Sequence, residues 1–308
     1  MDYLLDNKNL VEVRYHAPRG QRRLYSLAAD LSREYLFPSD VLVGVIGLEG
    51  AGKSTLIRGL FPGLELTNDD EGINHNTSPL FEFDEHDFFS GHTFHLDIRF
   101  ESAFHQMHEI ADAIRKAINA GRRVVVEHFD LIYPYLGHNA QVIFAISEEL
   151  RIYRPTIFGP TPKEIKQYVD ENTKYRLMAH SAEDLTSYIM ETEFNCKPPA
   201  LHSDIKHGFI IGFREKPDID LDLLEKKVRE FIDRDEKIYP GDGNYVHMGD
   251  LKIYCTGKRI HAKSTGQIEN FRLVKEFIVD PITKEFLLIG IAGPDQELQI
   301  STDAQIAH

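Results

Sequence analysis

The residues with the clearest chemical signature lie in a glycine-rich segment, GLEGAGKS, at positions 47–54. The spacing Gly-x4-Gly-Lys-Ser is that of a loop whose backbone N–H groups turn inward around the phosphates of a nucleotide. In this pattern Lys53 neutralises the β- and γ-phosphates, and Ser54 ligates Mg2+. The motif predicts a site for ATP or GTP with Mg2+, and nothing in the sequence distinguishes the two bases. The predicted nucleotide-binding residues are Gly47, Gly50, Ala51, Gly52, Lys53, Ser54 and Thr55.

The elements that flank this loop are those that the motif requires. An apolar run at 41–46 predicts a strand, and the pattern at 55–60 predicts a helix whose N-terminus adds the positive end of its dipole. Further along, the spacing of apolar residues predicts a helix over 102–120 and buried strands over 123–127 and 140–146. Strands that alternate with helices indicate an α/β domain with a parallel sheet.

Three segments beyond the loop resemble the uridine-kinase-like branch of P-loop phosphotransferases. They are FDEHDFF at 83–89, FHLD at 94–97 and VVVE at 124–127, and the likeness covers residues 41–154. In that family the first segment places an aspartate near the acceptor hydroxyl. The last segment ends a strand with a glutamate and a following glycine, and this chain has His128 in place of the glycine.

The resemblance implies three acidic site residues. Asp87 is the general base or the group that orients the acceptor hydroxyl, and Asp97 is a weaker candidate for the substrate side. Glu127 acts on Mg2+ through water, so the predicted catalytic set is Lys53, Asp87 and Glu127. The residues alone leave a second interpretation open, in which Asp87 and Asp97 are surface charges, because carboxylates are common on surfaces.

An arginine-bearing lid follows the strand corresponding to 142–146 in kinases of this type. Here only Arg151 and Arg154 precede a proline-rich segment, PTIFGPTP at 155–162, which we predict to be a linker. A short lid fits a slow NTPase or a nucleotide sensor as well as a kinase.

The C-terminal half carries a second resemblance. The segment VHMGDLKIYCTGKRIHAKSTGQI at 246–268 resembles the editing domain of alanyl-tRNA synthetase, also called the second additional domain, which also occurs alone as alanyl-tRNA editing proteins. The family pattern runs Gly-Asp, a short strand, Cys-Gly-Gly-Thr-His and then Thr-Gly-x-Ile. An amphipathic helix predicted at 221–235 precedes the segment as the family's helix does, and the likeness covers residues 163–293.

In that family, one Zn2+ is held by a His-x3-His pair on a helix, the cysteine and the later histidine. The matching residues here are His180, Asp184, Cys255 and His261, with aspartate in place of the second histidine. The i, i+4 spacing puts His180 and Asp184 on one helical face. Cys255 lies two residues too early, so the loop after it must bulge if its sulfur is to reach the metal. Two outcomes are open: a Zn2+ site, or a degenerate domain that has lost its metal.

The organisation predicted from these patterns has four parts. Residues 1–38 form an N-terminal leader segment, 39–154 a P-loop NTPase or kinase-like domain, 155–162 the linker and 163–308 an α+β domain resembling the editing domain. Within the last part we expect helices at 163–171, 182–191 and 221–235, a turn-rich stretch at 195–203, and strands at 251–255, 271–279 and 286–291.

Composition limits the function classes. The net charge of -14 over 308 residues argues against coating by nucleic acid along the whole chain. The net charge still allows a local basic patch. Five basic residues lie near the second motif: Lys258, Arg259, Lys263, Arg272 and Lys275. They are candidates for contact with the acceptor end of a tRNA, or they are ordinary surface charges. Only two cysteines are present, which favours a reducing compartment. Without a signal peptide pattern or a long apolar run, we expect a cytoplasmic protein that does not enter membranes.

Three functions compete on the sequence. The first is an enzyme that transfers phosphate from ATP to a small hydroxyl-bearing substrate such as a nucleoside, with the editing-like domain binding substrate or tRNA. The second is a nucleotide-gated hydrolase that edits mischarged aminoacyl-tRNA. The third is a non-catalytic, nucleotide-responsive regulator that binds RNA. The intact glycine-rich loop favours the first, whereas Asp184 and the displaced Cys255 count against the second.

Overall fold

The computed structural model describes residues 11–18, 21–67, 78–82, 92–199, 203–205, 208–255 and 260–293. The chain divides into two compact units, Met1–Glu171 and Asn172–His308. The division falls inside helix α6 (Pro162–Glu193), which contributes its first turns to one core and its remainder to the other.

The first unit is built on a six-stranded sheet with the strand order β1-β6-β5-β2-β4-β3. Strands β5, β2, β4 and β3 run parallel, whereas β6 is antiparallel to β5 and β1 is antiparallel to β6. Its strands are β1 (Glu12–His16), β2 (Leu42–Gly47), β3 (Thr93–Asp97), β4 (Arg123–Glu127), β5 (Val142–Ile146) and β6 (Glu149–Tyr153). The α/β class is confirmed, but the sheet is mixed rather than parallel throughout. Only Ser147 and Glu148 separate β5 from β6, and so short a connection forms an antiparallel hairpin.

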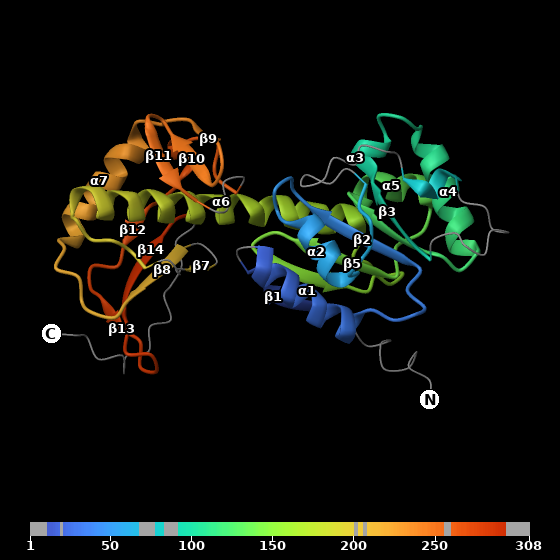
Figure 1. The fold of residues 1–308 in the computed structure, drawn as a ribbon, viewed down its shortest axis with the longest axis horizontal. Coiled ribbons are helices and arrows are strands. Elements are labelled where there is room, and N and C mark those ends of the chain that lie inside the picture. The colour runs from blue at the N-terminus through green and yellow to red at the C-terminus, as the bar shows by residue number, and fades with distance from the viewer. Residues whose placement is uncertain are drawn as a thin grey trace. The chain divides into compact units, whose positions relative to one another are not determined.

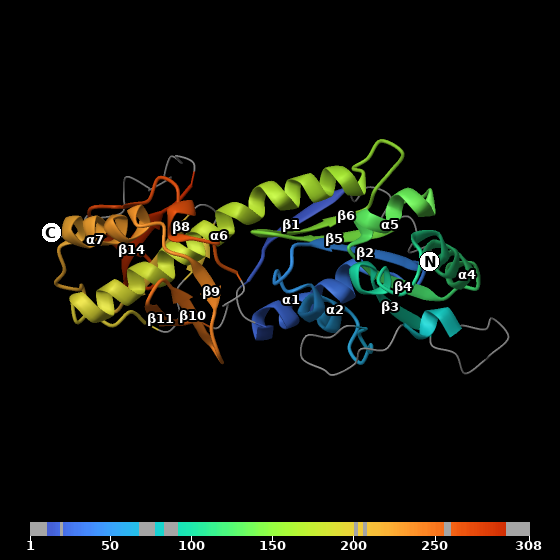
Figure 2. The ribbon, with the colours of Figure 1, turned by 90° about the horizontal axis from the view of Figure 1, so that it is seen from above.

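Helices cover both faces of this sheet. Along β2, side chains alternate between the faces: Val43 and Val45 join one apolar cluster, and Leu42 and Ile46 join the other. Helices α1 (Gln21–Tyr35) and α2 (Lys53–Leu60) lie against the first face (Figures 1 and 2). The opposite face is covered by α4 (Met107–Asn119), α5 (Phe129–Leu136) and the start of α6.

The segment expected to be a leader is part of the first unit. Strand β1 pairs along β6, from Glu12 opposite Tyr153 to His16 opposite Glu149. Helix α1 buries Leu24, Ala28 and Leu31 in the same cluster as α2. Residues 11–18 and 21–38 therefore complete the sheet edge and its cover and do not form a separate segment.

The predicted helix over 102–120 corresponds to α4 alone, which begins later, at Met107, and a separate short helix lies before the predicted range. The short α3 (Ile98–Glu101) is capped by the Asp97 carboxylate, which accepts hydrogen bonds from the N–H groups of Arg99 and Phe100. Helix α4 begins at Met107 with a capping box between Gln106 and Glu109. A 3-10 turn, η1 (Pro79–Glu82), packs beside α4 and β3.

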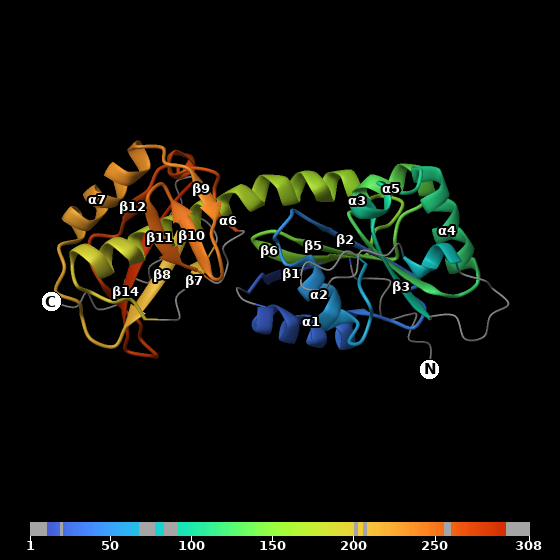
Figure 3. The ribbon, with the colours of Figure 1, turned by 45° about the horizontal axis from the view of Figure 1, so that its top comes forward.

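The second unit is α+β. One sheet has the order β11-β10-β9, and the other has the order β12-β14-β8-β7 with β13 paired to β14. The strands are β7 (Ser203–Ile205), β8 (Gly208–Phe213), β9 (Ile238–Pro240), β10 (Tyr245–Met248), β11 (Leu251–Tyr254), β12 (Arg272–Leu273), β13 (Ile278–Val279) and β14 (Phe286–Ile291). Helix α7 (Leu221–Asp233) and the turn η2 (Thr265–Gln267) complete the unit, and α6 runs between its sheets (Figures 1 and 3).

The two helices predicted at 163–171 and 182–191 are one continuous helix, α6. The polar residues Thr173, Arg176 and His180, which lie between the two predicted helices, are buried in the structure. Since the chain has no glycine or proline between Lys163 and Glu193, nothing in the backbone interrupts the hydrogen-bond ladder. The predicted linker 155–162 is accordingly the loop that leads from β6 into α6 within the first unit.

The strand predictions for the second unit are partly right. Strand β14 matches the predicted 286–291, and β11 ends one residue before the predicted 255. The predicted strand over 271–279 consists of two short strands, β12 and β13. Strand β8 was not predicted, although it pairs with β14 over six residues at the centre of its sheet. Among the described residues, no helix has both the length and the apolar character needed to cross a bilayer.

Candidate functional site

The glycine-rich loop joins the end of β2 to the start of α2. Gly52 has φ 97, a left-handed conformation that favours glycine, and an added Cβ there would lie 2.6 Å from Leu24. An added Cβ at Gly47 would meet Ile146 at 2.6 Å. Lys53 begins the helix and is 7% exposed, and Ser54 and Thr55 follow it, half-buried. The backbone needs glycine at these two positions, so the spacing of the motif has a structural cause.

The side chain of Lys53 turns toward the neighbouring strand. Its Nζ donates a hydrogen bond to the Leu48 carbonyl over 3.1 Å and lies 3.7 Å from Oε2 of Glu127. Glu127 is the last residue of β4, which runs parallel to β2. The carboxyl ends of neighbouring parallel strands meet at one edge of a sheet, where α/β folds bind ligands. The fold therefore brings a buried lysine and a buried carboxylate together at that edge.

His95 extends this pair into a chain of contacts. The Thr67 N–H donates to Nδ1 of His95 over 3.1 Å, so Nδ1 carries a lone pair and the ring proton of neutral His95 is on Nε2. Nε2 lies 3.3 Å from Oε1 of Glu127. Burial raises the pKa of Glu127, but His95, Lys53 and His128 lower it, and the net pKa lies below its ordinary value. Glu127 is thus an anion at neutral pH.

Asp97 and His128 complete the polar cluster. Asp97 ends β3 in register with Glu127, and His128 follows Glu127 directly. His128 has φ 58, a left-handed conformation that costs a non-glycine residue about 1–3 kcal/mol. The resemblance predicts a glycine at position 128, and glycine adopts this left-handed conformation readily. Burial lowers the pKa of His128 to about 3, and the charges of Lys53 and Arg99 act in the same direction, so its ring is neutral.

The two candidate lid arginines make structural ion pairs. Arg154 forms hydrogen bonds of 2.8 Å to both carboxylate oxygens of Asp40. Arg151 pairs with Glu149 at 2.7 Å and with Glu12 at 2.9 Å. Both side chains hold the edge of the sheet together in this structure. Asp87 lies outside the described residues.

The second candidate site brings together the four residues that the editing resemblance named. His180 and Asp184 come from α6, Cys255 follows β11, and His261 comes from the segment after the loop. Sγ of Cys255 is 3.3 Å from Nε2 of His180, and Nε2 of His261 is 2.9 Å from Oδ2 of Asp184. The two histidine rings have centroids 4.3 Å apart. All four residues are buried, and one ligand atom from each lies within 4.8 Å of the others.

These separations suit a single metal ion. Ligands about 2.0–2.3 Å from a tetrahedral zinc lie about 3.3–3.7 Å from one another. Three of the six pairs span 2.9 Å for His261–Asp184 to 3.8 Å between Nε2 of His180 and Oδ2 of Asp184, and all six are within 4.8 Å. Two nitrogens, one sulfur and one carboxylate oxygen are all ligands that zinc accepts. The donor set and its spacing therefore fit Zn2+, and Cys255 reaches the cluster despite its displacement in the motif.

Neighbouring groups support this arrangement. Oε2 of Glu183 lies 3.8 Å from Nδ1 of His180, the ring nitrogen that does not contact Cys255. A carboxylate behind a metal-binding histidine orients the ring and favours the tautomer whose Nε2 faces the metal. Ser181 accepts a hydrogen bond of 3.0 Å from the Ala262 N–H, which ties the segment carrying His261 to α6. Ser181 and Ala262 directly follow His180 and His261, so this hydrogen bond holds the two histidines close together.

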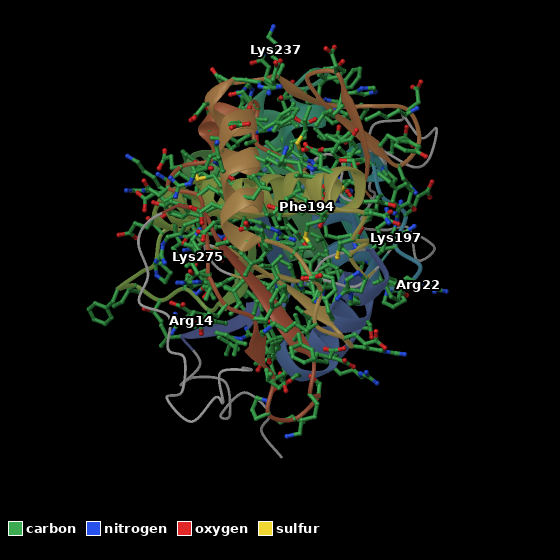
Figure 4. The ribbon with its side chains drawn as sticks, turned by 90° about the vertical axis from the view of Figure 1, so that its left-hand side faces the viewer. Arg14, Arg22, Phe194, Lys197, Lys237 and Lys275 are labelled. Carbon is green, nitrogen blue, oxygen red and sulfur yellow. The ribbon has the colours of Figure 1, made fainter. Side chains whose placement is uncertain are left out.

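The basic residues near this motif do not form one free patch among those described. Lys275 contacts Asp222 and Glu225, each at 2.7 Å, so its charge is matched by carboxylates on α7. Lys275 is labelled in Figure 4. Lys263 is exposed, whereas Lys258 and Arg259 lie outside the described residues.

Comparison of the chain with models of known protein families, and with curated proteins, finds no match.

Sequence reasoning missed the roles of His95 and Thr67, and it noted His128 only as a departure from a family pattern. The FHLD segment contained a signal for His95: in a strand, side chains at alternate positions share a face, which places His95 and Asp97 on the same side. Thr67 had no such signal, because its contact with His95 joins positions far apart in the chain.

Proposed function

We propose that this protein is an ATP- or GTP-binding, Mg2+-dependent phosphotransferase that acts on a small hydroxyl-bearing acceptor such as a nucleoside. One observation carries the proposal. Buried Lys53 and ionised Glu127 lie 3.7 Å apart at the carboxyl ends of adjacent parallel strands, beside the start of α2. The loop that contains Lys53 has the phosphate-binding pattern, and the N-terminus of the following helix favours an anion.

Each residue has a defined task in this proposal. Lys53 leaves the Leu48 carbonyl and neutralises the transferred phosphate. Ser54 and Glu127 supply oxygen ligands, directly or through water, which suit Mg2+ and let it neutralise the phosphate charge. His95 holds Glu127 in place through the contact at Nε2. Asp87 orients the acceptor hydroxyl and takes its proton.

A slower activity is the second candidate, and the arginines favour it. Phosphoryl transfer is accelerated strongly by an arginine that reaches the transferred group. Arg151 and Arg154 are instead held in ion pairs with Glu149, Glu12 and Asp40. This arrangement supports a slow NTPase or a nucleotide-responsive regulator unless those pairs break on substrate binding.

For the second unit we propose an editing-like domain with a bound Zn2+. The support is the convergence of His180, Asp184, Cys255 and His261. Four protein ligands fill a tetrahedral shell, as in structural zinc sites, whereas catalytic zinc keeps one position for water. The editing family also holds its zinc with four protein ligands, so this count alone does not decide against hydrolysis. The aspartate at position 184 in place of a histidine is what counts against the editing hydrolase and favours a domain that binds substrate or tRNA.

A turnover screen tests the proposal. Purified protein is incubated with ATP or GTP and Mg2+, with nucleosides or tRNA added in separate reactions, and nucleotide loss and phosphorylated product are both measured. A nucleoside that gains phosphate at the expense of nucleotide supports the phosphotransferase. Nucleotide loss without any phosphorylated product supports the slow NTPase, and release of an amino acid from mischarged tRNA supports the editing hydrolase. Lys53→Ala is the control for contaminating activity.

A further inference from the structure

The cluster beside Lys53 contains a nitrogen donor that Mg2+ chemistry does not use. One ligand atom each from Asp97, Glu127 and His128 lies within 4.8 Å of the other two. The three residues are 9%, 5% and 4% exposed. Two carboxylates and an imidazole thus converge where β3 and β4 end, and the register that pairs Asp97 with Glu127 sets their spacing.

His128 is placed for a ligand. Its Nδ1 is buried and has no hydrogen-bond partner within the described part of the chain. The residue caps α5 without a side-chain hydrogen bond. A buried polar atom without a partner is unfavourable, and an ion that accepts the nitrogen lone pair removes that penalty.

We propose that Asp97, Glu127 and His128 bind a divalent first-row transition cation of the Mn2+ class. Mg2+ prefers oxygen ligands and water, whereas an imidazole nitrogen shifts preference toward transition metals. Carboxylate and imidazole ligands lie about 2.1 Å from such an ion, so ligands on its opposite sides are about 4.2 Å apart. The ligand atoms of Asp97, Glu127 and His128 are all within 4.8 Å of one another.

The inference deepens the proposed function, since this ion accompanies the nucleotide at the same sheet edge. In the structure, Nζ of Lys53 lies 3.7 Å from Glu127, and its positive charge opposes a cation there. Phosphates that draw Lys53 away from Glu127 remove this opposition. Nucleotide and cation therefore strengthen each other's binding, and the effect is reciprocal.

Mn2+ titration followed by electron paramagnetic resonance tests the site on the whole chain without nucleotide. The variants are His128→Gly and His128→Asn, because both residues accept the left-handed backbone at φ 58. The matched control is His138→Asn, an exposed histidine of the same unit. We expect both His128 variants to lose on the order of tenfold or more in Mn2+ affinity. Competition with Mg2+ should show little change in Mg2+ affinity, so the preference for Mn2+ falls.

Pulsed electron paramagnetic resonance on bound Mn2+ supplies the second measurement. Wild type should show coupling to a directly bound imidazole nitrogen, and the His128 variants should lose it while His138→Asn retains it. The cluster around His180 is unchanged in all these proteins, so any signal from it cancels in the comparison. Unchanged Mn2+ affinity and nitrogen coupling in His128→Gly would overturn the proposal. Nucleotide binding measured on the same variants separates this failure from a failure of the proposed function.

Discussion

Nε2 of His261 lies 2.9 Å from Oδ2 of Asp184, although the two residues are 77 positions apart in the chain. Asp184 supplies the one carboxylate among the four clustered residues, so the contact joins an imidazole nitrogen to an oxygen donor. The same Asp184 oxygen is 3.8 Å from Nε2 of His180, and Sγ of Cys255 also contacts that nitrogen. The four donors form a metal-sized arrangement.

Zinc content is the most direct consequence. Elemental analysis of protein purified without chelator should find about one zinc per chain, because the four donors fill a tetrahedral shell. Cys255→Ser should lower zinc occupancy and the thermal midpoint, since it removes the thiolate. Cys196→Ser is the matched control, as Cys196 is the only other cysteine and lies outside the cluster. Equal zinc content in the two variants would show that Cys255 is not a ligand.

Nucleotide affinity depends on Lys53. Lys53→Ala should weaken ATP or GTP binding by about 2–5 kcal/mol, because a buried charge pair with phosphate is lost. Isothermal calorimetry measures the affinity, and far-ultraviolet circular dichroism checks the fold. Lys116→Ala, an exposed lysine on α4, is the control. If Lys53→Ala binds nucleotide as tightly as wild type, the loop is not a phosphate site.

The acceptor side depends on Asp87. Asp87→Asn should keep nucleotide affinity but lower kcat by on the order of 10²–10⁴, as expected when a general base is removed. Steady-state kinetics with the acceptor found by the turnover screen, together with calorimetry, separates the two effects. A parallel loss of nucleotide affinity would reassign Asp87 to the metal, the nucleotide or the fold.

Glu225 makes the stability of the second unit depend on pH. Burial raises the pKa of Glu225, but Lys275 and the Leu273 N–H lower it, and the net pKa lies below its ordinary value. The folded state therefore binds fewer protons than the unfolded state near that ordinary value. Its contribution to stability is present at neutral pH and is lost as pH falls through the folded pKa.

Glu225→Gln should thus cost about 1–3 kcal/mol at pH 7 and less as the pH falls below about 4. Urea unfolding at several pH values measures this difference. Glu230→Gln is the matched control, because Glu230 is an exposed carboxylate on the same helix. A cost for Glu225→Gln that is the same at every pH would contradict the role assigned to its charge.

The sequence alone determined the local parts of this protein. Gly47 and Gly52 are needed by a tight backbone path, so the loop pattern predicted a strand, a turn and a helix that the structure contains. Apolar periodicity likewise located α7 and β14, because the apolar residues that one face of an element buries recur at a regular spacing in the sequence. The four residues named for the metal came from the order of short motifs, and the structure brings them together.

Only the tertiary structure decided how distant segments meet. Strand β1 gave no local sign that it forms the edge of the six-stranded sheet, since its pairing with β6 depends on residues more than a hundred positions away. Helix α1 likewise gave no local sign that it covers a face of that sheet. Helix α6 is continuous where two helices were predicted, and its buried polar residues, such as Arg176 and His180, have no apolar spacing that would show their burial in the sequence. His128 shows the same limit. Its unpartnered nitrogen becomes meaningful only when the parallel register of β3 and β4 places Asp97 beside Glu127, and register is a property of pairing rather than of either strand.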